Sequence, residues 1–201
     1  MLSKAHLTIG TAAVLTVMMP DSLPEVIPCV FGAAAGCVIC DIDCEANEKA
    51  DASRGRITAA LIAAASLIID NLLRTGMLDT ASPNWPYLGC LGIAVFVITC
   101  AFASVSSHRG FSHSLLALAL ETGSLWLVLP GAAKPFAIAF ISHILLDITN
   151  KKPIRLLYPL KKGYCLGLFY ANRLADKVFT AAGTVWLIAV IALFVRVSRL
   201  G

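Results

Sequence analysis

Seven apolar runs separated by short polar loops dominate this chain of 201 residues. Hydrophobic residues make up 58% of the sequence and charged residues 14%, whereas soluble domains contain roughly a quarter charged residues. A water-soluble fold cannot bury so much apolar surface, so the pattern predicts an integral membrane protein. The runs lie at about 7–19, 24–40, 57–73, 87–105, 112–130, 135–148 and 178–195.

The length and spacing of the runs predict an all-α fold, a polytopic transmembrane bundle of six to seven helices in one membrane-embedded domain over residues 1–201. The runs 7–19 and 135–148 are short. As helices they span only about 20 Å, so we expect them to be tilted, buried among neighbours or re-entrant. Lys4 precedes the first run as in a signal peptide. No small-x-small cleavage site follows, so we expect this segment to remain in the mature protein.

The basic residues predict how the helices are oriented. If all seven runs cross the membrane, twelve of the sixteen lysines and arginines lie on the same side of the membrane as the N-terminus. The positive-inside rule makes that side cytoplasmic. Five of these residues lie within 150–167, and such a cluster attracts anionic lipid headgroups. No continuous basic stripe indicates direct binding of nucleic acid. The other side keeps Arg74, Lys134, Arg196 and Arg199.

All four histidines lie at the ends of apolar runs, and the same threading places them at the cytoplasmic side together with three aspartates. A single histidine at a membrane interface is more often a hydrogen-bonded anchor than a ligand. Seven such residues from four separate segments would rarely meet at one depth by chance, so together they predict a metal site. The predicted ligands are His6, Asp41, Asp43, His108, His113, His143 and Asp147.

The spacing of these residues supports the hypothesis. His143 and Asp147 are four residues apart, so on a helix they lie one turn apart on the same face, as two ligands of one ion must. His108 and His113 flank Gly110, which permits a tight turn that holds two imidazoles at the mouth of a helix.

Asp41 and Asp43 alternate by two at the end of the second run. This spacing suits carboxylates that project from an extended segment or bridge adjacent metals. The simpler alternative is that both acids end a helix beside Arg54 and Arg56.

The seven cysteines lie mostly inside the apolar runs, where a thiol behaves as a small hydrophobe. Cys37, Cys40 and Cys44 have a spacing found in zinc sites, but no second cysteine pair or nearby histidine completes the set. We therefore expect small residues packed between helices, and no disulfide framework.

Imidazole and carboxylate donors suit a divalent metal, zinc before manganese or iron, and seven ligands allow one or two ions with an open position for water. The candidate catalytic residues are Arg109, His113 and Glu121. The forked guanidinium of Arg109 suits a phosphate or carboxylate of a substrate, although an interfacial anchor explains it equally well. Glu121 lies eight residues after His113, about 12 Å deeper in the membrane, where it could support the ligands or relay protons. His113 is the other candidate proton carrier.

Five sequence elements together carry a family resemblance: His6, Asp-Ile-Asp at 41–43, His-Arg-Gly-Phe-Ser-His-Ser at 108–114, His-Ile-Leu-Leu-Asp at 143–147 and Leu-Leu-Tyr-Pro-Leu at 156–160. With these elements the sequence resembles the YdjM family of bacterial inner-membrane proteins, described as membrane-bound metal-dependent hydrolases, some of them as LexA-binding. The resemblance extends to about residue 167, and Cys40 and Cys44 stand where the family usually has proline and a polar residue. The closing His-x-x-x-acid pair is also similar to that of zinc-dependent phospholipases C, which favours phosphoester over peptide hydrolysis.

We therefore expect a multi-pass protein of the bacterial inner membrane, whose cytoplasm-facing site hydrolyses an amphiphilic phosphoester such as a phospholipid. Membrane lipid is then both its surroundings and its substrate class. Two alternatives stay open. The same ligands could bind a metal ion or protons in transit through a transporter, or the chain could be a non-catalytic membrane partner of a LexA-type regulator.

Overall fold

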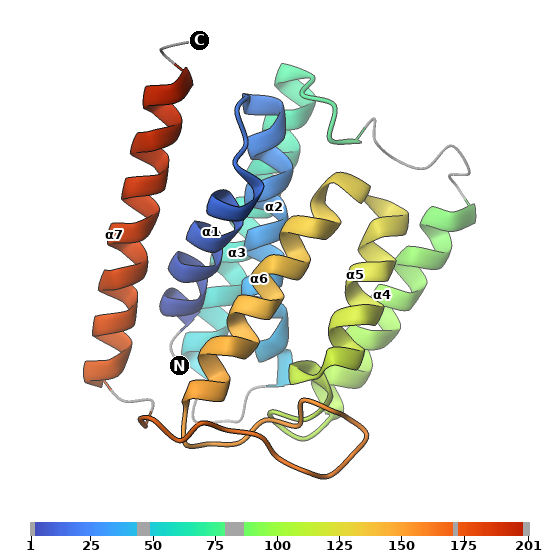
Figure 1. Cartoon of the computed structure of the whole chain (residues 1–201). Coiled ribbons are helices and arrows are strands. Elements are labelled where there is room, and N and C mark those ends of the chain that lie inside the picture. Colours follow the sequence, from blue (N-terminus) through green and yellow to red (C-terminus); the bar gives the residue numbers. More distant parts are fainter. Residues whose placement is uncertain (1–2, 44–48, 79–86, 171–172, 199–201) are drawn as a thin grey trace.

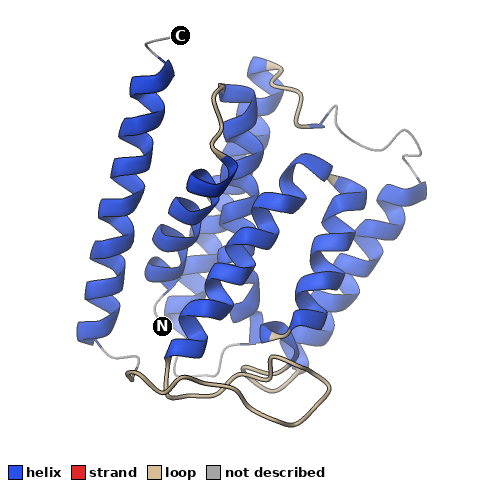
Figure 2. Cartoon of the chain, in the orientation of Figure 1, coloured by secondary structure: helices blue, strands red, loops and turns tan. Residues whose placement is uncertain are grey.

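The computed structural model describes residues 3–43, 49–78, 87–170 and 173–198, which form helices and contain no strand (Figure 2). The predicted all-α bundle is confirmed. The elements are α1 (Ser3–Met18), α2 (Leu23–Val38), the 3₁₀ helix η1 (Ile39–Asp43), α3 (Lys49–Leu73), α4 (Tyr87–Val105), the 3₁₀ helix η3 (Phe111–His113), α5 (Leu115–Val128), α6 (Pro130–Thr149) and α7 (Arg173–Ser198).

Successive α-helices run in opposite directions through the bundle, so its two ends collect different connections (Figure 1). One end, which we call the site end, contains the start of α1, η1, the connection between α4 and α5, and the long loop 150–170. The α2 start, the α5–α6 turn and the C-terminal end of α7 lie at the other end. Among the described helices, five are long and apolar enough to cross a membrane.

The length of one predicted segment was wrong. The run 135–148 lies inside α6, which has 20 residues and is about 30 Å long, enough to span a bilayer. The helix begins at Pro130 and continues through Pro135, since membrane helices tolerate the missing N–H when neighbouring elements pack closely around them. The shorter helices are α1, with 16 residues, and α5, with 14 residues. Each runs from the site end toward the other end of the bundle (Figure 1).

Helices α2 and α6 pack closely because two glycines of α2 face α6. A Cβ at Gly32 would lie 2.5 Å from the Ala132 carbonyl oxygen, and a Cβ at Gly36 would lie 2.4 Å from the Phe136 carbonyl oxygen. Only residues without a side chain allow such an approach, and small residues four apart are typical of interfaces between membrane helices. This contact holds the first half of α6 against the second half of α2.

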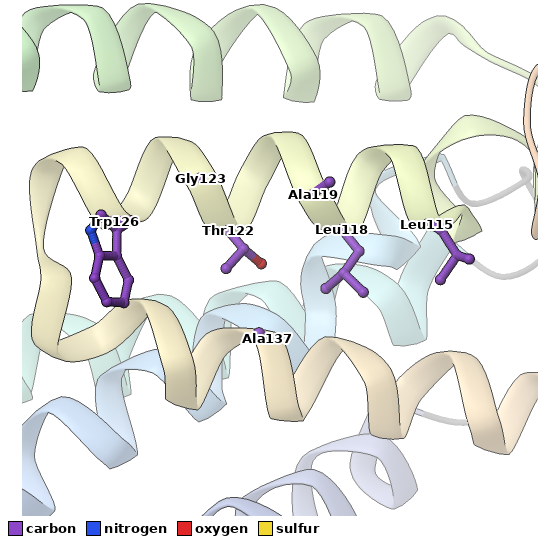
Figure 3. A pocket seen from close by; sticks show the side chains of 7 residues that line it. All are labelled: Leu115, Leu118, Ala119, Thr122, Gly123, Trp126 and Ala137. Atoms are coloured by element: carbon purple, nitrogen blue, oxygen red, sulfur yellow. The ribbon is translucent and has the colours of Figure 1, made fainter.

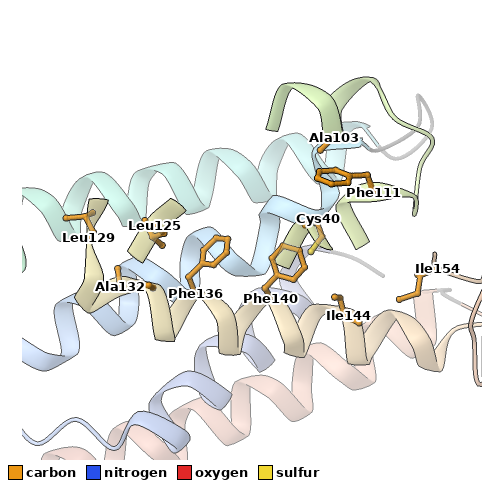
Figure 4. Close-up of a cluster of buried hydrophobic side chains, with 12 residues drawn as sticks. Cys40, Ala103, Phe111, Leu125, Leu129, Ala132, Phe136, Phe140, Ile144 and Ile154 are labelled. Atoms are coloured by element: carbon orange, nitrogen blue, oxygen red, sulfur yellow. The ribbon is translucent and has the colours of Figure 1, made fainter. Parts of the chain in front are cut away.

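An apolar cluster runs along the bundle from Ile154 at the site end to Leu129 at the α5–α6 turn (Figure 4). Phe136 and Phe140 of α6 are fully buried and pack with Phe111 of η3 and Ile154 of the 150–170 loop. The cluster therefore ties α6 to the connection between α4 and α5. Cys40 belongs to it as a small buried residue, and the cysteines among the described residues are free thiols. Cys44, the third member of the spacing noted above, lies outside the described residues.

Helix α7 lies at the edge of the bundle, where it packs along α1 (Figure 1). Gly183 allows this contact, since a Cβ there would lie 2.5 Å from the Thr8 hydroxyl. Most of the remaining surface of α7 is apolar and exposed, as expected for a helix that faces lipid.

Candidate metal centre

Five of the seven predicted ligands meet in two overlapping groups at the site end. The first group is His6, Asp41 and His143, and the second is His113, His143 and Asp147. Within each group the nitrogen and oxygen atoms lie within 4.8 Å of one another. All five residues are buried, and they come from α1, η1, η3 and α6. Segments far apart in the sequence thus bring nitrogen and oxygen donors to one place, as zinc and similar divalent ions require.

His143 is held in one orientation by the packing of α6 on α2. Its Nδ1 lies 2.7 Å from the backbone carbonyl oxygen of Cys37, to which it donates a hydrogen bond. The proton is therefore on Nδ1, and the Nε2 lone pair points toward Asp41, whose Oδ1 lies 3.6 Å away. Histidines that bind metals in proteins are oriented in this way. The ring also stacks on His6, with centroids 3.7 Å apart and planes 10° apart.

A second chain of hydrogen bonds orients His113. The Ser112 hydroxyl donates to Asp43 Oδ2 at 2.5 Å and lies 2.8 Å from His113 Nδ1, whose proton it accepts. His113 Nε2 is then left with its lone pair directed toward Asp147, whose Oδ2 is 3.2 Å away. The arrangement leaves His113 Nε2 directed into the centre, an orientation that suits a ligand better than a free proton carrier.

Asp43 and His108 lie outside both groups and contact each other. His108 Nδ1 is 3.0 Å from Asp43 Oδ1, and the Arg109 backbone N–H donates to Asp43 Oδ2 at 3.0 Å. Asp43 therefore anchors the connection between α4 and α5, including Ser112, to the end of α2. In this arrangement it positions His113 and contacts none of the other predicted ligands on α1 or α6.

The side chains of Asp41 and Asp43 point to different sides because residues Ile39–Asp43 form a 3₁₀ helix. The expectation of an extended segment there was wrong. In a strand, residues two apart share a face, whereas three residues per 3₁₀ turn direct them to different sides. Asp41 accordingly faces His143, and Asp43 faces His108. Arg56 of α3 supports this turn by donating to the Asp41 carbonyl oxygen at 2.9 Å.

Arg109 joins the metal centre to the 150–170 loop. One guanidinium nitrogen lies 3.1 Å from Asp147 Oδ2, and another donates to the Lys152 carbonyl oxygen at 2.8 Å. Its own carbonyl accepts the Arg155 N–H at 2.9 Å. The residue has a φ of 61°, an uncommon conformation for a side chain other than glycine, which the surrounding contacts hold in place. These contacts place Arg109 as a support for Asp147, where the sequence left substrate binding and anchoring open.

The donor atoms of the centre fit a cation. Among the described residues, both ring nitrogens of His6 and the Nε2 atoms of His113 and His143 are buried and make no hydrogen bond. A buried polar atom without a partner is unfavourable by about 1–3 kcal/mol, and a cation bound among these imidazoles would give their nitrogens a partner. Asp41 and Asp147 supply the negative charge to balance it.

The geometry limits how many ions the centre can take. Only Nε2 of His143 is available, because Nδ1 is bonded to Cys37, and one imidazole nitrogen binds one ion. The two groups therefore cannot each bind a separate ion through His143. An ion in either group would take His143 Nε2 as a ligand, and a second ion would have to bind without it.

Glu121, the remaining candidate from the sequence, lies apart from both groups. It is 1% exposed, inside α5, and its Oε2 makes no hydrogen bond to the described residues. A carboxylate buried in this way is rare in a membrane helix and is a candidate for function in its own right.

Comparison with known proteins identifies the family. The model of the YdjM inner membrane protein family matches residues 1–200. The chain belongs to this family. No curated protein and no solved structure matches it.

Membership of the YdjM family confirms the resemblance found in the sequence, and with the five long apolar helices it makes the chain a multi-pass membrane protein. The segment 108–114 of this family member forms the end of the α4–α5 connection, η3 and the cap of α5, where the Ser114 hydroxyl accepts the Ala117 N–H. The segment 143–147 supplies two donors from adjacent turns of α6.

Sequence reasoning missed the contacts by which three groups shape the centre. Ser112 was visible beside His113, but its partner Asp43 is 69 residues away. The Cys37 carbonyl has no sequence signal, because every residue has one. Asn150 is 1% exposed and ends α6, where its N–H donates to the Asp147 carbonyl oxygen at 3.2 Å. Its position three residues after Asp147 was the available signal.

Proposed function

We propose that this YdjM-family protein is a membrane-bound metal-dependent hydrolase that acts on an amphiphilic phosphoester, with its centre open to the cytoplasmic side. The observation that carries the proposal is the meeting of His6, His113 and His143 with Asp41 and Asp147 in one buried cluster. Zinc is the ion that such a nitrogen and oxygen donor set suits best, with manganese or iron as alternatives.

The roles of the residues follow from their contacts. A divalent ion in this centre would lower the pKa of water and stabilise negative charge on a phosphoryl oxygen. Ser112 and the Cys37 carbonyl hold His113 and His143 with Nε2 toward the centre. Asp41, whose side chain is 12% exposed, is more accessible than its neighbours and is placed to accept a proton from entering water.

Elemental analysis of the detergent-purified protein tests the metal. We expect about one transition-metal ion per chain, lost in His143→Ala because this residue belongs to both groups. His108→Ala is the matched control and should keep the ion, since His108 contacts Asp43 outside the groups. Protein purified without any bound metal would contradict the proposal.

Hydrolysis is measured in parallel, by following the release of products from phospholipids of defined headgroup in mixed micelles. Loss of turnover in His143→Ala together with loss of metal is the expected result. Turnover that persists in the metal-free variant would exclude a metal-dependent mechanism.

The buried carboxylate of Glu121 favours a second candidate, a transporter of metal ions or protons. That function requires a titratable group deep in the bilayer, so Glu121→Gln would abolish transport into proteoliposomes. A hydrolase with its centre at the bundle end should keep its bound metal and most of its turnover in the same variant.

A further inference from the structure

A shallow groove runs along the outside of the bundle between α5 and α6 (Figure 3). Its volume is about 420 Å³. Residues of α5 three and four positions apart line it, so they form a single stripe on that helix, from Leu115 through Leu118 to Trp126, with Ala137 of α6 on the opposite wall. The lining is almost entirely apolar, which matches a hydrocarbon chain.

One end of the groove lies next to the metal centre. Leu115 follows the ligand candidate His113 by two residues, and its backbone N–H donates to the Leu156 carbonyl oxygen of the 150–170 loop at 3.0 Å. Trp126 lies eleven residues further along α5, about 17 Å away. The groove thus leads from the metal centre toward the middle and far side of the membrane.

Small residues keep the groove open at its centre. A Cβ added at Gly123 would meet no atom within 4 Å, and Ala119 and Ala137 add only methyl groups. In contrast, a Cβ added at Gly32 or Gly36 of α2 would lie less than 3 Å from backbone atoms of α6. Gly123 therefore serves no close helix contact, and its absent side chain leaves space for another molecule.

The loop that meets the groove at the site end is positively charged. Exposed Lys151, Lys152, Lys161 and Lys162 lie on the 150–170 loop, which also contributes the Leu156 carbonyl at the groove's mouth. A cationic loop at the end of an apolar groove complements an anionic headgroup attached to an acyl chain.

We propose that this groove binds an acyl chain of an anionic phospholipid substrate and so presents its headgroup phosphate to the metal centre. The inference rests on the proposed hydrolytic function for the identity of the headgroup, whereas binding of the chain can be measured without turnover. The apolar stripe on α5 then selects substrates by their acyl chain, and the lysine-rich loop selects them by the negative charge of their headgroup.

Photolabelling of the full-length protein in detergent tests the groove. The probe is phosphatidylglycerol with a diazirine at the end of one acyl chain, and labelled peptides are mapped by mass spectrometry. We expect labelling within 115–128 that unlabelled phosphatidylglycerol competes and phosphatidylcholine does not. Gly123→Leu fills the groove and should lower this labelling about tenfold or more, as should Ala137→Leu from the other wall.

The matched control is Ala182→Leu, which adds the same bulk to an exposed position of α7 and should change nothing. Equal labelling of wild type and Gly123→Leu, or equal competition by both lipids, would overturn the inference, because the groove would then hold only surrounding lipid. Specific labelling without any hydrolysis would support chain binding and contradict the hydrolase. Hydrolysis together with labelling spread evenly over α3, α4 and α7 would contradict binding of the acyl chain in the groove but not the hydrolase function.

Discussion

Ser112 connects a carboxylate from one part of the chain to an imidazole from another, through contacts to Asp43 and His113. Ser112→Ala removes the hydroxyl that fixes the His113 ring, so His113 can rotate and its Nε2 no longer points steadily at the centre. Loss of such an orienting group typically lowers metal affinity about 10-fold to 100-fold. Competition with a chelating dye measures the affinity of the purified protein for zinc.

The neighbouring Ser114 provides the control for this experiment. Its hydroxyl caps α5 by accepting the Ala117 N–H at 3.1 Å and contacts no candidate ligand. Ser114→Ala should therefore lower the stability of the fold by about 1 kcal/mol while zinc affinity stays unchanged. An equal loss of affinity in both variants would show that Ser112 acts only through local stability.

Arg109 is the residue whose predicted role the contacts refine most. Because its guanidinium reaches both Asp147 and the Lys152 carbonyl, Arg109→Lys can keep only one of the two contacts. We expect the 150–170 loop to become more sensitive to limited proteolysis and turnover to fall, while the helices stay folded. Lys161→Ala alters an exposed cation of the same loop and should leave proteolysis unchanged. Unchanged proteolysis in Arg109→Lys would contradict a role in holding the loop.

At the scale of helices, the close contact between α2 and α6 determines where His143 lies. Gly36→Ala would place a Cβ 2.4 Å from the Phe136 carbonyl oxygen, so the helices must separate and stretch the His143 contact with Cys37. We expect a loss of about 1–3 kcal/mol in stability and of bound metal, measured by thermal unfolding in detergent and elemental analysis. Gly123→Ala meets no atom and should be neutral or stabilising. A Gly36→Ala protein with unchanged metal content would contradict this coupling.

The same helices show how far sequence alone could lead. Apolar runs predicted the helices, because the thickness of the bilayer determines how long an apolar helix must be. The depth of each histidine in the membrane followed from counting how often the chain crosses it. The difference between Asp41 and Asp43 was not predictable, since it depends on the chain continuing α2 as a 3₁₀ turn. The start of α6 was missed because Pro135 reads locally as a helix boundary, although packing against α2 sustains the helix through it.

For the whole molecule, the orientation in the membrane decides which compartment supplies the substrate. The positive-inside rule predicts that the site end, with the basic 150–170 loop, faces the cytoplasm. Cys165 lies exposed on this loop, whereas Arg74 is exposed just after the end of α3, at the opposite end of the bundle. The native thiol and an Arg74→Cys variant thus report on the two sides of the membrane.

A membrane-impermeant maleimide applied to vesicles, followed by peptide mapping, reads this orientation. We expect Cys165 to react in inverted inner-membrane vesicles and to be protected in right-side-out spheroplasts, while the thiol of Arg74→Cys shows the reverse pattern. Cys37 and Cys40 are buried and should stay unmodified in both, which confirms that the bundle is intact. Reaction of Cys165 from the outside would place the metal centre in the periplasm, where a hydrolase could reach only lipids of the outer leaflet. The proposed cytoplasmic substrate would then be excluded, because charged headgroups do not cross the bilayer core unaided.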